Sequence, residues 1–234
     1  MVNTNMEQVF VSWSGGKDSC LAGYLAMKDG IEVRYLANTV SEDGQISRSH
    51  GLSAEVLRLQ SQAIGIPLIQ QKTRQDSYET DFKTMLSSLK QKGITGGVFG
   101  DIDFNPHREW LDRVCGDAGI TPHYPLWLQP QDKIMRDFVE LGFETVVVAT
   151  KADLLGREWL GRKVDLAFIK DLAALGKNIT PCGEAGEYHT LVIDGPMFKQ
   201  RLEILEAAKV LRDGRWFFEI QKSKLRQKQS LKKI

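Results

Sequence analysis

The chain has 234 residues, of which 26% are charged and 42% are hydrophobic, and its formal net charge is +1. This composition is ordinary for a globular protein, and the length is sufficient for one large domain or two small ones. No apolar stretch approaches the length of a membrane span and the N-terminus is polar, so we expect neither a membrane partner nor a signal peptide.

The three cysteines lie far apart, and none forms a Cys-x-x-Cys pair: Cys20, Cys115 and Cys182. This spacing is typical of reduced thiols and argues against a zinc site. We therefore expect a cytoplasmic protein whose cysteines are packing residues.

The first half of the chain alternates predicted strands and helices. Strands are predicted over residues 9–13, 31–39, 66–69 and 97–102. Helices are predicted over residues 19–28, 53–64, 78–90 and 108–118. Repeated units of this length predict an α/β fold, a parallel sheet flanked by helices, with ligands bound at the carboxyl ends of its strands.

The loop that joins the first strand to the first helix is built from small, polar and charged residues: Ser14, Gly15, Gly16, Lys17, Asp18 and Ser19. The two glycines allow a tight turn in which successive N–H groups point at one phosphate. The helix N-terminus and Lys17 add positive charge, and the two serines add hydroxyl donors. The sequence therefore predicts a site for the phosphates of a nucleotide.

Two common phosphate-binding motifs do not match this loop. A Walker loop needs Gly-Lys directly before Ser or Thr, whereas Asp18 stands between Lys17 and Ser19. The Gly-x-Gly-x-x-Gly fingerprint is absent because Gly15 and Gly16 are adjacent. The loop instead resembles the PP-loop of ATP pyrophosphatases, which cleave ATP between its α and β phosphates. The alternative is a glycine-rich turn with a solvated lysine and a capped helix, which six matched residues disfavour.

The regular alternation of predicted strands and helices ends in a proline-rich segment at residues 122–130. Helices follow over 132–141 and 164–175, and a strand over 145–150. Residues 190–193 and 216–221 are predicted to pair as antiparallel strands. We therefore predict a nucleotide-binding domain over 1–124 and a smaller α+β acceptor domain over 125–221.

The last residues form a basic tail over 222–234. Six of the 31 basic residues lie between Lys222 and Lys233 with no acid among them, so the rest of the chain carries more acid than base. We expect this tail to be solvated and frayed, and the acidic balance of the body disfavours a nucleic-acid partner.

Six segments outside the glycine-rich loop narrow the class: residues 100–102, 108–115, 124–127, 159–162, 182–190 and 194–196. Together with that loop they make the chain similar to the diphthine–ammonia ligase family of PP-loop enzymes, from about residue 9 to residue 218. The segment Gly-Glu-x-Gly-Glu-Tyr at 183–188 separates this family from other PP-loop ligases.

The resemblance implies a PP-loop, HUP-like nucleotide-binding fold that uses ATP and Mg²⁺. It also implies a reaction in which ATP adenylates a carboxylate and ammonia displaces AMP to give an amide. The characterised acceptor is diphthine, a modified histidine of elongation factor 2. A homo-oligomer is compatible with the resemblance.

Several side chains are candidates for the nucleotide and metal. Lys17 and the loop amides are expected to bind phosphate, and Asp18 and Asp101 to bind Mg²⁺, although Asp18 could instead cap the helix. Asn38 and Thr39 lie at the end of the second predicted strand, where adenine or ribose would lie in a PP-loop fold, or are ordinary turn residues. His50 is expected to close over the nucleotide.

Glu184 and Glu187 are the remaining catalytic candidates. They lie three residues apart between glycines, which predicts a tight loop exposing both carboxylates. In the family reading they hold the trimethylammonium of diphthine together with Tyr188, or the incoming ammonium. The alternative is a solvated acidic turn.

Two other functions remain open at this stage. One is a PP-loop enzyme that acts on a different small molecule or a modified nucleoside. The other is an ATP-binding regulator without turnover, against which the retained lysine and carboxylates argue.

Overall fold

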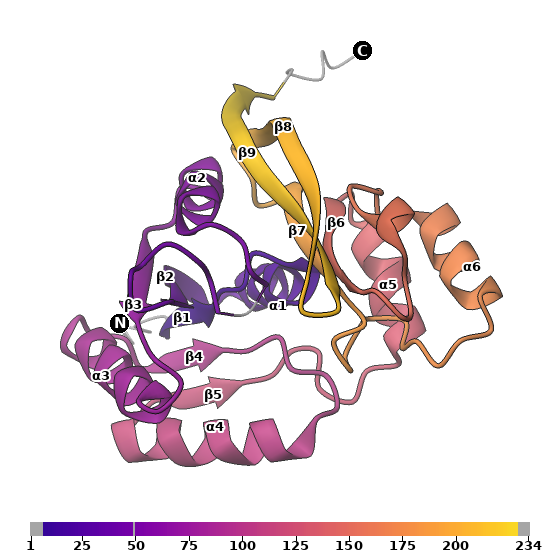
Figure 1. Cartoon of the computed structure of the whole chain (residues 1–234). Helices are drawn as coiled ribbons and strands as arrows, with labels where there is room; N and C mark the ends of the chain where they lie inside the picture. Colours follow the sequence, from indigo (N-terminus) through magenta and orange to yellow (C-terminus); the bar gives the residue numbers. More distant parts are fainter. Residues whose placement is uncertain (1–6, 49, 229–234) are drawn as a thin grey trace, which may run out of the picture.

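The computed structural model describes residues 7–48 and 50–228 and contains two sheets (Figure 1). The first sheet is parallel, in the order β3-β2-β1-β4-β5. Its strands are β1 (Gln8–Ser12), β2 (Glu32–Val40), β3 (Leu68–Lys72), β4 (Gly96–Val98) and β5 (Thr121–His123). Its helices are α1 (Lys17–Lys28), α2 (Ala54–Ile64), α3 (Tyr78–Gln91) and α4 (Asn105–Ala118).

Alternation along β1 places its side chains in two apolar clusters. Val9 and Val11 belong to a cluster that contains Leu21 of α1 and Leu57 of α2. Phe10 points to the opposite face, where a second cluster holds residues of α3 and α4. A strand whose residues are apolar on both faces is typical of the centre of a parallel sheet. The predicted α/β class is confirmed.

The second sheet is antiparallel, in the order β7-β6-β9-β8. Its strands are β6 (Glu144–Lys151), β7 (Tyr188–Asp194), β8 (Gln200–Arg212) and β9 (Arg215–Gln227). The same region holds α5 (Gln131–Glu140), the 3-10 helix η1 (Arg157–Trp159) and α6 (Leu166–Ala174). This is the predicted smaller α+β domain. The predicted pairing of 190–193 with 216–221 is wrong, because β6 lies between β7 and β9 and pairs with both.

The basic tail begins later than predicted. Residues 222–227 belong to β9, which pairs along its length with β8 in a long hairpin (Figure 1). Two lysines near this end have acidic partners: Lys224 of β9 lies 3.4 Å from Glu203, and Lys228, which follows β9, lies 2.6 Å from Asp194. Opposite charges on neighbouring strands stabilise such a hairpin. Residues 229–234 lie outside the described residues.

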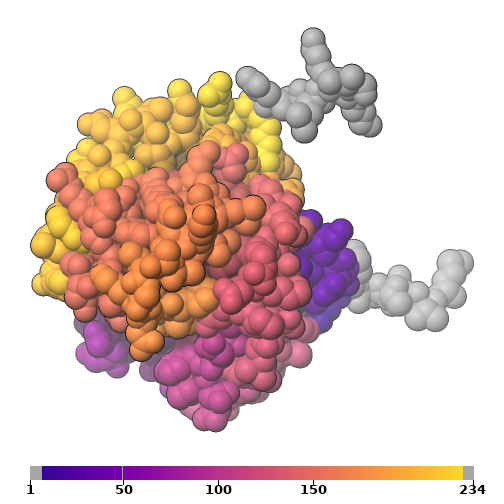
Figure 2. Space-filling model, turned by 90° about the vertical axis from the view of Figure 1, so that its right-hand side faces the viewer, coloured from indigo at the N-terminus to yellow at the C-terminus, as the bar shows by residue number. Residues whose placement is uncertain are grey.

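The two halves of the chain share one apolar core. The cluster that contains Leu21 of α1 continues into Phe138 of α5 and Val192 of β7. Figure 2 shows the second half, in orange and yellow, lying directly against the first half. The β7 strand therefore packs on the glycine-rich loop, and its Val192 N–H donates to the Gly15 carbonyl at 3.0 Å.

No helix among the described residues is both long and apolar enough to cross a membrane.

Candidate active site

The site lies where the strand order reverses. β1 and β4 are neighbours, and the chain leaves them in opposite directions, so the loops after their carboxyl ends flank a crevice. Gly100, after β4, approaches the first turn of α1 so closely that a Cβ there would lie 2.9 Å from the Asp18 carbonyl carbon. Glycine at this position therefore brings Asp101 next to Asp18.

The glycine-rich loop has the shape of an anion cradle. Gly15 has φ +79°, a conformation that other residues rarely adopt. The Gly16 N–H donates to the Ser14 hydroxyl at 3.2 Å, and the Lys17 N–H donates to the Thr190 hydroxyl at 3.1 Å. Two donors of the loop are thus held by side-chain hydroxyl oxygens.

Lys17 is the centre of the site. Its side chain is buried, and its ammonium donates to the Asp18 carboxylate at 2.8 Å and to the Cys182 carbonyl. Its Nζ also lies 5.3 Å from the centroid of the Tyr188 ring. Burial is the largest single influence and disfavours the charge, but Asp18, Tyr188 and Cys182 together outweigh it, and the pKa of Lys17 is above its ordinary value. Lys17 is therefore a fixed positive charge.

Four carboxylates gather beside Lys17, and we call them the acidic group: Asp18, Asp101, Asp103 and Glu184. Burial and then the Asp18 charge raise the pKa of Glu184 to about 7, with smaller contributions from Asp103 and Asp101 and an opposing one from Lys17. Asp101 also binds His107, and this hydrogen bond raises the pKa of that imidazole. The structure thus brings together carboxylates from distant parts of the sequence. The two that are farthest apart in the chain, Asp18 and Glu184, are separated by 166 positions.

Glu187 differs from the prediction of two exposed carboxylates. It is 1% exposed, and its Oε1 accepts the Thr180 N–H at 2.7 Å, whereas its Oε2 has no partner among the described residues. Tyr188 is buried as well, beneath Lys17. Glu184, by contrast, is partly exposed and lies near Asp18 and Lys17, and the turn at Gly186 separates it from Glu187.

Asn38 and Thr39 lie at the end of β2 and are both buried. The Asn38 amide donates to the Trp13 carbonyl at 2.8 Å and to the Ser47 hydroxyl at 3.0 Å. The Thr39 carbonyl accepts the Arg48 N–H at 3.0 Å. These contacts hold the segment after β2 in place beside the loop, and His50 of that segment lies over Gly16, where a Cβ would be 2.7 Å from His50 Nε2.

Two family models cover nearly all of the chain. The diphthamide synthase N-terminal domain matches residues 7–122, and the diphthamide synthase C-terminal domain matches residues 130–225. The chain belongs to the diphthamide synthase family. The family resemblance stated from the sequence motifs is therefore confirmed.

Curated relatives from the same family are named diphthine–ammonia ligase. The Schizosaccharomyces pombe protein is 30% identical over 82% of this chain and 35% of its own length. The Rattus norvegicus protein is 26% identical over 82% of this chain and 80% of its own length. The Homo sapiens protein is 25% identical over 85% of this chain and 82% of its own length. The chain thus spans about a third of the fission-yeast relative and most of the mammalian ones.

One solved structure, titled as that of a predicted subunit of tRNA methyltransferase from Methanocaldococcus jannaschii, aligns with 81% of this chain and 98% of its own at 16% identity. Its TM-score of 0.45 is too low to support a conclusion about function.

Within this diphthamide synthase chain, two glutamines organise the site and were not predicted. Gln60 of α2 is buried: it accepts from Trp13 Nε1 at 2.8 Å and donates to the carbonyls of Gly15 and Val192 at 2.9 and 2.7 Å. It therefore joins the glycine-rich loop to β7. Its helical spacing of four residues from Val56, on the apolar face of α2, is the sequence signal that could have revealed it.

Gln131, at the start of α5, joins the other two loops. Its Nε2 donates to Asp103 at 2.8 Å, and its Oε1 accepts the Cys182 N–H at 3.0 Å. One side chain thus fixes both the loop after β4 and the loop that carries Glu184. No local pattern in the sequence distinguishes this glutamine from a solvated one.

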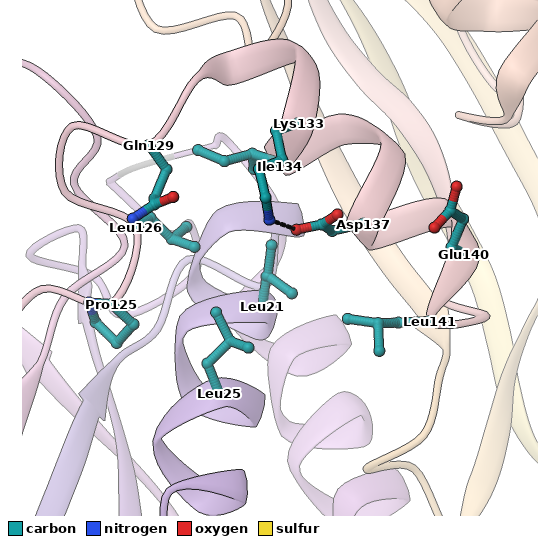
Figure 3. A pocket seen from close by; sticks show the side chains of 10 residues that line it. All are labelled: Leu21, Leu25, Pro125, Leu126, Gln129, Lys133, Ile134, Asp137, Glu140 and Leu141. Atoms are coloured by element: carbon teal, nitrogen blue, oxygen red, sulfur yellow. Dashed lines mark hydrogen bonds and ion pairs between the residues drawn. The ribbon is translucent and has the colours of Figure 1, made fainter.

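A separate cavity of about 380 Å³ lies between α1, α5 and the segment before α5 (Figure 3). Leu21, Leu25 and Ile134 give it apolar walls, and the Lys133–Asp137 ion pair crosses one side. None of the predicted site residues lines it, so it is distinct from the candidate active site.

Proposed function

We propose that the chain is a diphthine–ammonia ligase: ATP adenylates a carboxylate, pyrophosphate leaves, and ammonia displaces AMP to form an amide. The predicted ATP-dependent amidating ligase is confirmed at the level of reaction class by the family and by the names of the relatives. One observation carries the proposal for this site. The buried Lys17 ammonium donates to Asp18 in the glycine-rich loop, and it lies close enough to Glu184 to oppose the rise in the pKa of that carboxyl.

The glycine-rich loop is proposed to hold the phosphates of ATP. Phosphate oxygens would accept the Gly16 and Lys17 N–H groups in place of the Ser14 and Thr190 hydroxyls. The N-terminus of α1 and the Lys17 ammonium stabilise the negative charge that develops as pyrophosphate departs.

The acidic group has a donor set that fits Mg²⁺. Asp18 Oδ1 is buried and has no partner among the described residues, and the Asp101 carboxylate lies on the adjacent loop. No group of three or more His, Cys, Asp or Glu side chains in the described part of the chain could hold a metal by itself. Mg²⁺ typically binds one or two carboxylates and completes its shell with phosphates and water, so we propose Asp18 and Asp101 as its ligands. When bound, the ion would neutralise phosphate charge.

Glu184 is proposed to prepare the nucleophile. A carboxylate whose pKa is about 7 is well matched to accept a proton from ammonium near neutral pH. The ammonia that remains then bonds to the acyl carbon as the bond from that carbon to the AMP oxygen breaks. The neighbouring carboxylates of the acidic group favour the entry of a cation.

The acceptor is proposed to be the diphthine carboxylate of elongation factor 2, as the names of the relatives suggest. Three buried free thiols support a reducing compartment, and we propose the cytoplasm.

The test incubates the protein with ATP, ammonium and elongation factor 2 that carries diphthine, followed by mass spectrometry of the factor and chromatography of the nucleotides. We expect conversion of acid to amide with AMP and pyrophosphate as products, and loss of both in Lys17→Ala. The matched control, Lys28→Ala at the other end of α1, should behave as the wild type. ADP and phosphate would contradict the reaction class, and AMP without an amidated factor would point to another acceptor.

A further inference from the structure

A second polar pocket lies on the other side of the glycine-rich loop. It has a volume of about 440 Å³ and lies between the segment after β2 and strands β7 and β9. Its polar lining is made of serine, arginine and histidine side chains: Ser41, Ser47, Arg48, His50, His189 and Arg215. We call this the cationic pocket. No carboxylate of residues 7–48 or 50–228 lines it.

The positive charges of the pocket are not balanced by carboxylates. Among the described residues, none places a carboxylate oxygen within 4.0 Å of the Arg48 or Arg215 guanidinium. Arg215 is also directly opposite Lys151 in the β6–β9 register, and like charges in that arrangement destabilise a sheet. Both side chains turn to carbonyls, Lys151 to Ala185 at 2.7 Å and Arg215 to Gly186 at 3.0 Å.

The pKa values of the two imidazoles in the pocket are lowered mainly by burial and, after it, by neighbouring basic groups. Their ring centroids are 4.6 Å apart. Burial, with Arg215 and Lys17 next, lowers the pKa of His189 to about 4. Burial also holds the pKa of His50 well below its ordinary value, and its buried Nδ1 has no partner within the described ranges. Both rings are therefore neutral at pH 7.

We propose that the cationic pocket binds an oxyanion, a carboxylate or a phosphoryl group, immediately beside the glycine-rich loop. The planar fork of a guanidinium matches two oxygens of either group, and Ser47 and His50 supply further polar contacts. His50 also forms the boundary with Gly16, so an anion here would lie next to the phosphates of ATP. The acceptor carboxylate and the phosphate chain of the nucleotide are the two sources.

The experiment follows the imidazole nitrogen resonances of His50 and His189 by NMR, while acetate or pyrophosphate is added to the full chain. Arg215→Gln and Arg48→Gln remove one cation each. Arg226→Gln, an exposed arginine farther along β9, is the matched control. Circular dichroism checks that each variant folds, and Arg215→Lys retains the charge if Arg215→Gln does not fold.

We expect saturable shifts of both imidazoles and an apparent Kd that rises about tenfold in each arginine-to-glutamine variant but not in Arg226→Gln. A response to acetate identifies a carboxylate site, and a response to pyrophosphate alone identifies a phosphoryl site. The inference is overturned if neither anion shifts these resonances. It is also overturned if binding is lost in Lys17→Ala but unchanged in both Arg48→Gln and Arg215→Gln, because the anion then occupies only the loop. Anion binding without any AMP formation would preserve this inference and contradict the proposed function.

Discussion

Two groups of opposite charge share Lys17 as a neighbour. In the acidic group, burial and neighbouring carboxylates raise the pKa of Glu184 to about 7. In the cationic pocket, burial and neighbouring cations lower the pKa of His189 to about 4. Lys17 opposes the first shift and contributes to the second.

This contrast indicates what each group lacks. Both shifts move a side chain toward its neutral form: burial is the largest cause of each, and nearby charges are the second. Titratable groups whose pKa values are shifted in opposite directions within one site are typical of acid–base catalysis and ligand binding. A cation beside the acidic group and an anion in the cationic pocket would complete the site, as ammonium, Mg²⁺ and an oxyanion do in the proposed reaction.

Removing the shared neighbour should have the largest effect. Lys17→Ala deletes the charge between the two groups and leaves Asp18 without its partner. We expect the rate of AMP formation to fall by about 1,000-fold, since preorganised charge at a departing phosphate contributes on this scale. Steady-state kinetics measures this loss, and a variant within tenfold of the wild type would contradict a catalytic role for Lys17.

Changing the acidic group alone should lower the rate and alter its pH dependence. The pKa of Glu184 lies above its ordinary value, so its carboxylate form, the base, appears as pH rises through about 7. The wild-type rate should therefore increase with pH through 7 and then level. Glu184→Gln should lower kcat by about 100-fold and abolish that rise.

Glu187→Gln is the matched comparison for this prediction, because Glu187 is buried and holds the Thr180 N–H. It should reduce stability while the pH dependence of the remaining activity is retained. A rise through pH 7 that persists in Glu184→Gln would assign the titration to another group.

Breaking the link between the glycine-rich loop and β7 should destabilise the fold. Gln60→Leu leaves the Trp13 indole N–H and the carbonyls of Gly15 and Val192 without their partner. At 1–3 kcal/mol for a buried polar group, we expect the free energy of unfolding to fall by about 3 kcal/mol. Urea denaturation measures it, with the exposed Gln62→Leu as a control that should change it by no more than about 0.5 kcal/mol.

Loosening the acidic group without changing its charge should have the smallest effect. Gln131→Ala removes the contacts to Asp103 and to the Cys182 N–H. We expect a loss of about tenfold in kcat/KM, because Glu184 and Asp103 would then be held less firmly. The exposed Gln129→Ala should leave kcat/KM unchanged, and equal losses in both variants would contradict the positioning role of Gln131.

Local patterns in the sequence were sufficient for most of the first domain. Ser53 caps α2 by accepting the Val56 N–H, and Gly65 ends that helix with φ +83°, so the predicted helix was correct to within one residue. The glycine-rich loop could also be predicted, because the residues that define it are contiguous in the sequence. The strand β5 was not predicted, because its central residue is Pro122 and proline is unusual in strands other than edge strands.

Features that depend on contacts between residues far apart in the sequence could not be predicted from local patterns. The position of β6 between β7 and β9 follows from packing across more than 60 residues of chain, which strand patterns do not encode. The sequence around Glu187 predicts an exposed acid, but in the structure Glu187 follows the turn at Gly186 and is buried. Arg215 is one basic residue among many, and only the folded structure shows that it lines the cationic pocket together with Arg48.

A crystal structure with Mg²⁺ and a non-hydrolysable ATP analogue tests the central claim most directly. The account predicts phosphate oxygens at the Gly16 and Lys17 N–H groups, in place of the Ser14 and Thr190 hydroxyls, with the metal at Asp18. A triphosphate bound elsewhere, with the Lys17 ammonium still on the Cys182 carbonyl, would contradict it.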